Sequence, residues 1–107
     1  MTNSKHTSTK EKMNSFIKEL NTTDVFTIKL ASKEELVTRI TEHNDKEICL
    51  RKPMCMIQTQ NGVGMLPWAL TSGSLDLWIN VEHIMTIVKT NQEVASSYIQ
   101  STTGLTI

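Results

Sequence analysis

The stretch that decides the fold is LDLWINVEHIMTIVK, residues 75–89. Apolar and polar residues alternate in its first half, which predicts a strand with one buried face. The apolar positions of that strand are Leu75, Leu77, Ile79 and Val81. After a polar break at Glu82 and His83, residues 84–88 are rich in β-branched side chains and predict a second strand, buried on both faces or nearly so. Two strands with so short a link must turn sharply.

The size and overall charge of the chain exclude several classes of protein. With 107 residues it is long enough for one domain with a modest core. Lys and Arg together number 11, as do Asp and Glu, so the formal net charge is zero. A protein that binds nucleic acid mainly by neutralising phosphates is usually more basic. Neither a membrane span nor a secretory signal is readable, so we expect a cytoplasmic protein that does not bind membranes.

Charged residues are distributed unevenly along the chain. Residues 29–52 carry six basic and five acidic side chains, whereas residues 53–88 carry only Asp76 and Glu82. One small domain has difficulty burying so much uncharged surface within itself, so we expect part of residues 53–88 to pack against another copy of the chain. The alternative is an ordinary core with a polar, uncharged loop.

The remaining elements follow from similar patterns. Residues 1–7 are predicted to be a disordered tail and residues 8–21 an amphipathic helix. Further strands are predicted at 25–30, 36–43 and 47–57, and a second helix at 90–103. That helix begins with a capping box formed by Thr90 and Glu93.

A bend and an insertion modify this pattern. Pro53 cannot donate a hydrogen bond to a strand ladder, so it marks an edge, a bulge or a bend in the third strand. Residues 58–74 are predicted to form a hairpin-like insertion, with a turn at Asn61 and Gly62. No helix separates successive strands. The sequence therefore predicts a single domain over residues 1–107 that is mainly β, with a small, strongly bent, five-stranded antiparallel barrel at 25–88.

Two segments resemble the Sm/Lsm/Hfq superfamily. Residues 26–50, FTIKLASKEELVTRITEHNDKEICL, look like its first motif, and residues 77–88, LWINVEHIMTIV, look like its second. With the predicted N-terminal helix, the chain is most similar to divergent Sm-like proteins of marine phage or metagenomic origin. The resemblance implies an SH3-like barrel with a helix at each end, acting in the host cytoplasm if a phage encodes it.

The resemblance also implies an assembly and a binding site. In the family, the fourth strand of one protomer pairs with the fifth strand of the next, and the copies close into a homo-oligomeric ring. Two short turns then face a central pore and bind the bases of single-stranded RNA or DNA. In this chain the corresponding turns are residues 43–46 and 80–83. The implied nucleic-acid-binding residues are His43, Asn44, Lys46, Asn80 and His83.

The chemistry of these side chains suits a single strand. His43 can stack on an unpaired base, Asn44 can bond to its edge and Lys46 can contact a phosphate. Asn80 and His83 can complete the same pocket. The alternative for both turns is purely structural, because His-Asn-Asp-Lys is a favourable solvated turn and Asn80 can satisfy backbone groups.

Other conspicuous side chains are expected to be structural. Trp78 is predicted to contact another protomer or to cover the N-terminal helix. Cross-strand ion pairs are expected at Arg39, Arg51 and Lys52. Free, buried thiols are expected at Cys49 and Cys55. Core-filling roles are expected for Met54, Met56, Met65 and Met85.

Signatures of catalysis and metal binding are missing from the sequence. It contains no Gly-rich phosphate loop, no Ser-centred elbow and no paired carboxylates in apolar surroundings, so we expect neither an enzyme nor a cofactor or small-molecule substrate. The cysteines and histidines lack the spacing of a zinc site. The leading prediction is an Sm-like ring that binds single-stranded RNA in RNA processing or regulation. The alternative is a protein-interaction or assembly module without nucleic-acid binding, which Glu82 and Asn80-Val81 in place of the family's Arg-Gly favour.

Overall fold

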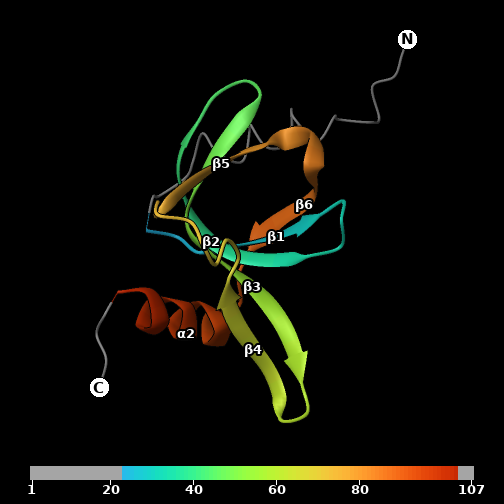
Figure 1. Cartoon of the computed structure of the whole chain (residues 1–107), viewed down its shortest axis with the longest axis vertical. Coiled ribbons are helices and arrows are strands. Elements are labelled where there is room, and N and C mark those ends of the chain that lie inside the picture. The colour runs from blue at the N-terminus through green and yellow to red at the C-terminus, as the bar shows by residue number, and fades with distance from the viewer. Residues whose placement is uncertain (1–22, 104–107) are drawn as a thin grey trace.

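The computed structural model describes residues 23–103, and the predicted tail at 1–7 and helix at 8–21 lie outside this range. Figure 1 shows a curled sheet with one helix beside it and a hairpin that projects from the body. The strands are β1 (Phe26–Leu30), β2 (Glu35–His43), β3 (Glu47–Thr59), β4 (Gly62–Pro67), β5 (Asp76–Asn80) and β6 (Ile84–Lys89). A single 3-10 turn, η1 (Val81–His83), joins β5 to β6, and the helix α2 spans Gln92–Thr102. The predicted antiparallel, mainly β fold with a C-terminal helix is confirmed.

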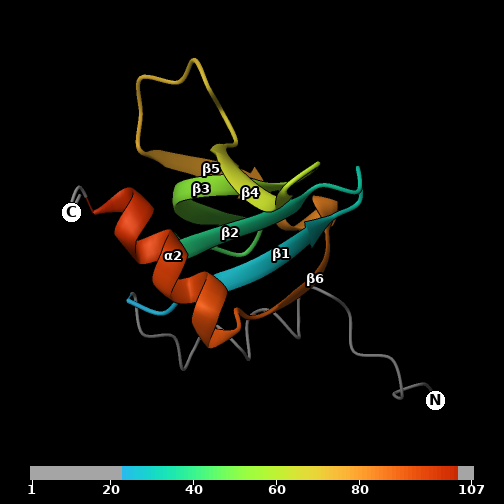
Figure 2. The same cartoon turned by 90° about the horizontal axis from the view of Figure 1, so that it is seen from below.

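The sheet has 6 strands in the order β4-β3-β2-β1-β6, and β5 also pairs with β3. The strand β2 occupies one edge of β3, while β5 and β4 share the other edge. The strand β5 pairs with residues 47–51 of β3 and β4 pairs with residues 54–59. The loop at residues 68–75 leaves the sheet between them, as Figure 2 shows. The strand that the five-strand prediction lacked is β4, which lies within the predicted insertion.

Irregularities in β2 and β3 bend the sheet. Between the pairs Val37↔Met54 and Arg39↔Arg51, β3 contains an extra residue, so a bulge lies at Lys52 and Pro53. Lys52 has a positive φ of 52°, and Pro53 has no N–H to donate. Because bulges increase the local twist and bend the strand, the sheet curls at this point. Of the three alternatives that Pro53 predicts, an edge, a bulge or a bend, the structure shows a bulge with a bend.

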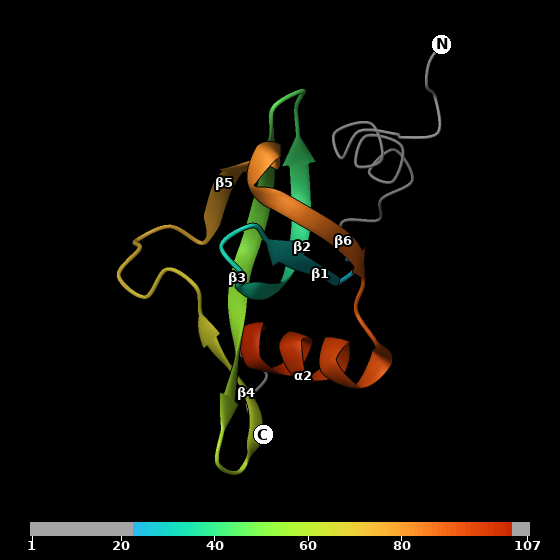
Figure 3. The ribbon, with the colours of Figure 1, turned by 90° about the vertical axis from the view of Figure 1, so that its right-hand side faces the viewer.

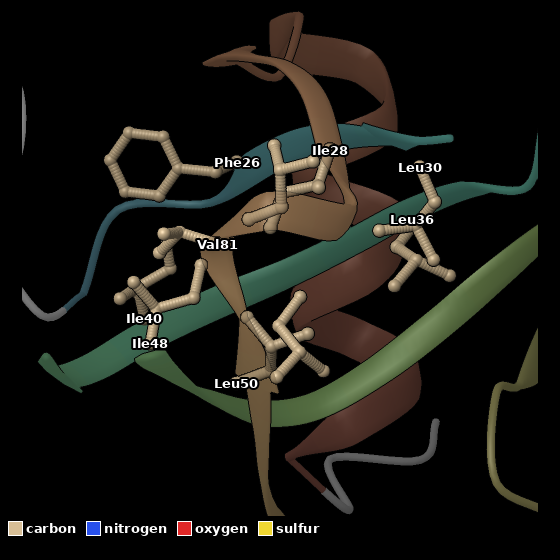
Figure 4. Close-up of a cluster of buried hydrophobic side chains, with 10 residues drawn as sticks. Phe26, Ile28, Leu30, Leu36, Ile40, Ile48, Leu50 and Val81 are labelled. Atoms are coloured by element: carbon tan, nitrogen blue, oxygen red, sulfur yellow. The ribbon is translucent and has the colours of Figure 1, made fainter. Parts of the chain in front are cut away.

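One apolar cluster fills the concave side of the sheet. Figure 4 shows side chains from β1, β2, β3 and η1 pointing toward one another in this cluster. Alternate residues of β1, Phe26, Ile28 and Leu30, are all buried in this cluster. Full burial of one such side chain stabilises the fold by about 1.5–3 kcal/mol.

The two strands predicted within residues 75–88 are less buried than expected. Ile79 and Val81 face the core, but Leu75 lies outside β5 and is 52% exposed. In β6 only Ile84 is buried, while Met85 and Val88 are exposed. The predictions of a strand buried on both faces and of Met85 as a core residue are therefore wrong. The reason is that β6 pairs with β1 alone among residues 23–103, so it remains an edge strand.

The helix α2 builds a second apolar cluster on the other face of the sheet. Tyr98 is fully buried there with Val25 and Val37, and half-buried methionines of β3 and β4 pack against them. The Tyr98 hydroxyl lies 2.6 Å from the Arg51 carbonyl oxygen and 3.0 Å from that of Lys52, so it donates to the backbone at the bulge. Burial raises the pKa of this phenol. The helix is therefore fastened to the bend in β3.

The start of α2 differs from the prediction. Its N-cap is Asn91, whose Oδ1 accepts a hydrogen bond from the Val94 N–H at 2.9 Å. The predicted cap, Thr90, instead bonds through its hydroxyl to the Thr27 hydroxyl at 2.8 Å. The partner of Thr90 is distant in sequence, which a local capping pattern cannot reveal.

The sheet is open. Within residues 23–103, β5 pairs only with β3 and β6 only with β1, so no hydrogen-bonded ladder joins β5 to β6.

Cys49 is buried and Cys55 is half-buried, and both thiols are free as predicted. In the same range, no helix has the length and apolar character required to span a membrane.

Candidate functional site

The first predicted binding turn lies between β2 and β3 and is organised by its own asparagine. The Asn44 Oδ1 accepts hydrogen bonds from the N–H groups of Lys46 and Glu47, both at 2.8 Å. The Asn44 N–H donates to the Glu47 carbonyl oxygen at 2.9 Å. Asn44 therefore has the structural role that its residue type favours in turns.

The second predicted turn is η1, and an asparagine organises it in the same way. The Asn80 Oδ1 accepts a hydrogen bond from the Glu82 N–H at 2.8 Å. Val81 is buried and fixes the turn to the core. Within residues 23–103 neither Asn44 nor Asn80 donates through its Nδ2, so each carboxamide can still offer a donor to a ligand.

Backbone hydrogen bonds hold the two turns together. The Val81 N–H donates to the Lys46 carbonyl oxygen at 2.8 Å, and Asn80 lies opposite Glu47 in the strand ladder. On the other side of η1, the Ala31 N–H donates to the His83 carbonyl oxygen at 2.7 Å. Figure 3 shows the green β2–β3 turn and the orange η1 at the same end of the sheet. We call residues 43–46 and 80–83 the two-turn junction; it contains every residue of the predicted nucleic-acid site.

The electrostatics of the two-turn junction are unfavourable for a polyanion. His43, Lys46 and His83 are exposed, as a single-strand site requires. Carboxylates stand next to them in the sequence, however, at Glu42, Asp45, Glu47 and Glu82. None of these carboxylates forms an ion pair within the described part of the chain, and Lys46 is the only lysine or arginine of the two turns. A phosphate backbone would therefore meet an excess of negative charge at neutral pH.

Sequence reasoning recognised only part of this acidic surface. Of these four carboxylates, it weighed only Glu82 against nucleic-acid binding. The actual partner of Arg51 is Asp76, with Arg51 Nη1 and Asp76 Oδ2 3.0 Å apart. The register of β3 with β5 makes these residues direct neighbours, and that register could not be read from the local pattern.

The structure also shows the surroundings of Lys52 and Arg39, the other two residues predicted to form ion pairs. The Lys52 Nζ donates to the Thr102 carbonyl oxygen at the end of α2. Arg39 forms no ion pair among residues 23–103, and its Nε is buried without a partner. The prediction of a cross-strand ion pair is confirmed for Arg51, whereas neither Arg39 nor Lys52 forms one within residues 23–103.

The outer edge of β5 is the second feature that could serve a function. The Lys52 N–H donates to the Leu75 carbonyl oxygen at 2.7 Å, so alternate residues from Leu75 onward turn their backbone groups toward β3. Asp76, Trp78 and Asn80 therefore turn theirs outward. The Ser74 side chain bonds to the backbone of Asp76, leaving Trp78 at the first open position. Trp78 is also 44% exposed.

The outer edge of β6 has a similar arrangement. The Thr90 N–H donates to the Val25 carbonyl oxygen at 3.0 Å, so Thr90 and Val88 turn their backbone groups toward β1. Ile87 and Lys89 turn theirs outward, where no strand of residues 23–103 pairs with them. The two open edges together offer unpaired donors and acceptors, which favour pairing with another strand.

Comparison with known proteins gives no independent indication of function, since neither family models nor curated proteins match this sequence. Metal binding receives no support from the geometry either. Among residues 23–103, no three His, Cys, Asp or Glu side chains come together in a group that could hold a metal ion.

Proposed function

We propose that this chain is a self-assembling module that forms a homo-oligomeric ring of the Sm type. The β5 edge of one copy pairs with the β6 edge of the next in antiparallel orientation. The observation that carries the proposal is the presence of two open, outward-facing edges that lie on different strands and therefore allow head-to-tail contacts. A head-to-tail contact that repeats with a closing rotation generates a ring.

The side chains of the two edges support a specific register. With Trp78 opposite Ile87 of the next copy, each can exchange backbone hydrogen bonds with the other. Asp76 lies two residues before Trp78, and Lys89 lies two residues after Ile87. Because the paired strands run antiparallel, Asp76 then lies opposite Lys89. Within one copy Asp76 already pairs with Arg51 and Lys89 with Asp24, so the contact would join these two ion pairs. An opposite-charge pair across strands contributes about 0.2–1 kcal/mol and disfavours the shifted registers. The exposed ring of Trp78 would be covered by the same contact.

We further propose that the protomer is a small, strongly bent, SH3-like barrel with the β3–β4 hairpin as an extension. Although β5 and β6 are not hydrogen-bonded to each other, side chains from both pack in one core cluster with β1. Ile79 comes from β5, Ile84 from β6 and Phe26 from β1. A shared core on the concave side supports a barrel whose final seam is closed by side chains.

Binding of single-stranded RNA is the second candidate function, and the contact between the two turns favours it. The histidine rings and the Lys46 ammonium are exposed at one end of the sheet, and both asparagines retain a donor. The carboxylates of the junction oppose it, since each copy in a ring would add to the same negative field. This charge is the reason for proposing the assembly module first.

The ring is tested by the mass of the assembly. Size-exclusion chromatography with light scattering should give the wild-type chain a mass several times its 12.1 kDa. Trp78→Lys should reduce the mass several-fold, because the change puts a charge on the paired edge. Glu82→Lys is the matched control, since it adds the same side chain off both edges and should retain the wild-type mass. A monomeric wild-type chain would refute the ring.

RNA binding is tested separately by fluorescence anisotropy with short U-rich and A-rich RNAs. We expect no saturable binding at physiological salt. Binding that resists salt indicates base contacts, because binding through phosphates alone weakens steeply as salt rises. Saturable, salt-resistant binding that is lost in the double variant His43→Ala, Lys46→Ala, with the ring mass unchanged, would make RNA binding the function instead.

A further inference from the structure

The β3–β4 hairpin has an open edge of its own. Figure 1 shows this hairpin extending away from the rest of the sheet. Residues 53–75, which contain β4, include no charged side chain. On β4, Val63 is 67% exposed and Leu66 is 45% exposed. Natural edge strands are usually protected by charges, and this edge lacks them.

The direction of the backbone groups along β4 follows from its ladder with β3. The Trp68 N–H donates to the Pro53 carbonyl oxygen at 2.9 Å, and the same register continues to the pair Thr59↔Gly62. Alternate residues of β4, including Leu66, Gly64 and Gly62, therefore bond toward β3. Val63 and Met65 turn their N–H and C=O groups outward. No strand within residues 23–103 pairs with them.

We propose that β4 pairs with β4 of a second copy about a twofold axis that passes beside Gly64. Around this axis, Val63 of each copy lies opposite Met65 of the other, and the two residues exchange N–H···O=C hydrogen bonds in both directions. Gly64 meets its own symmetry mate at the closest approach of the strands, where Cα atoms are about 4.5 Å apart. Neither glycine has a side chain to collide. The contact is isologous, so it joins copies in pairs.

The absence of charged side chains favours a second copy of the chain as the partner of this edge. An acidic or basic peptide, or a nucleic acid, would meet no opposite charge on residues 53–75. Two copies of a neutral edge do not repel each other, and their exposed valines and leucines are buried together. Each Å² of apolar surface removed from water contributes roughly 25 cal/mol.

This contact is distinct from the ring contact. The loop at residues 68–75 leaves the sheet between β4 and β5, so the two edges form separate surfaces (Figure 2). If the proposed ring exists, β4 pairing joins two rings; the pairing itself does not depend on the ring. Each contact therefore predicts a different change in mass.

The first test removes a donor from the outer edge of β4. Val63→Pro deletes the outward N–H but no hydrogen bond to β3, and proline is tolerated at such an edge position. Native mass spectrometry should give Val63→Pro half the wild-type mass. Val63→Thr, which keeps the N–H and the β-branched side chain, should retain the full mass. Equal masses for wild type and Val63→Pro would overturn the proposal.

A second variant tests the proposed twofold axis beside Gly64 without introducing a proline. A Cβ at Gly64 would lie 3.7 Å from Ile57 Cγ1, an ordinary contact, so a side chain can be added there. Gly64→Glu brings two carboxylates together across the axis and should also halve the mass, whereas Gly64→Ala should not. In Trp78→Lys the ring is lost but the β4 pair survives, so a dimer is expected. A monomeric Trp78→Lys chain would contradict β4 pairing while leaving the ring intact as an explanation of the wild-type mass.

Discussion

The two halves of β3 differ although they belong to one continuous strand. In the half that pairs with β5, Ile48, Cys49 and Leu50 are all buried. In the half that pairs with β4, residues 54–57 are half-buried and Gln58 and Thr59 are exposed. The boundary is the bulge at Lys52 and Pro53. The first half contributes fully buried side chains to the core, and the second half contributes side chains that remain partly exposed.

The sequence difference between the halves matches this division. The first half mixes buried apolar residues with charged ones such as Glu47 and Arg51, as expected of a strand with one solvated face. The second half is uncharged but remains partly exposed, which favours contact with another protein chain. A bulge thus separates a half of the strand with fully buried side chains from a half that stays partly exposed, and the proposed pairing of β4 would use the exposed half.

The largest expected difference in the free energy of unfolding is between the variants Leu50→Ala and Leu66→Ala. Leu50→Ala removes a side chain with 0% exposure and should lower the free energy of unfolding by about 2–5 kcal/mol. Leu66→Ala, on the half-exposed hairpin, should change it by no more than about 1 kcal/mol. Urea denaturation at one fixed protein concentration measures both, and equal effects would contradict the division of β3.

A smaller effect is expected at the boundary itself. Tyr98→Phe removes the hydroxyl that donates to the carbonyl oxygens of Arg51 and Lys52. The Arg51 carbonyl oxygen still accepts a hydrogen bond from the Thr38 hydroxyl at 3.2 Å, but the Lys52 carbonyl oxygen loses the Tyr98 donor, and a buried acceptor left without a donor costs about 1–3 kcal/mol. Ile99→Ala, a change on the exposed side of the same helix, is the control and should cost less in the same thermal denaturation experiment. A Tyr98→Phe chain as stable as wild type would mean that α2 does not hold the bulge.

The smallest effect concerns backbone strain. Lys33 and Lys52 both have positive φ, at 84° and 52°, which disfavours residues with a Cβ by about 1–2 kcal/mol. Lys33→Gly should therefore raise the melting temperature slightly. Lys52→Gly should raise it less, because it also removes the bond from Lys52 Nζ to the Thr102 carbonyl oxygen. A larger gain for Lys52→Gly would show that this bond does not stabilise the bulge.

Local patterns in the sequence were sufficient for much of the fold. Alternation located β1, β2 and β5, and the missing N–H of Pro53 located the bulge. The exposure of β6 was not predictable, because it depends on which strands lie beside it rather than on its own β-branched residues. The prediction of Thr90 as the cap of α2 failed for a related reason, since the Thr90 hydroxyl is bonded to the hydroxyl of Thr27, which is distant in sequence, and the cap is Asn91.

The position of the candidate site was predictable from the sequence, but its surroundings and the bonding of its asparagines were not. The turn residues of the two-turn junction were identified through the family resemblance, and the structure brings them to one end of the sheet. Their surroundings depend partly on strand register, which places Glu47 opposite Asn80. Both asparagine oxygens are also committed to the backbone, which residue type alone suggested only as an alternative.

The most direct test of edge pairing is amide hydrogen exchange at Trp78 and Ile87, whose N–H groups face outward from β5 and β6. Paired edges predict slow exchange at both amides under conditions where the oligomer is present, and faster exchange on dilution below its dissociation constant. The exposed loop around Gly73 supplies the reference rate for an unpaired amide. Exchange at Trp78 and Ile87 as fast as at Gly73, independent of protein concentration, would contradict assembly through these strands.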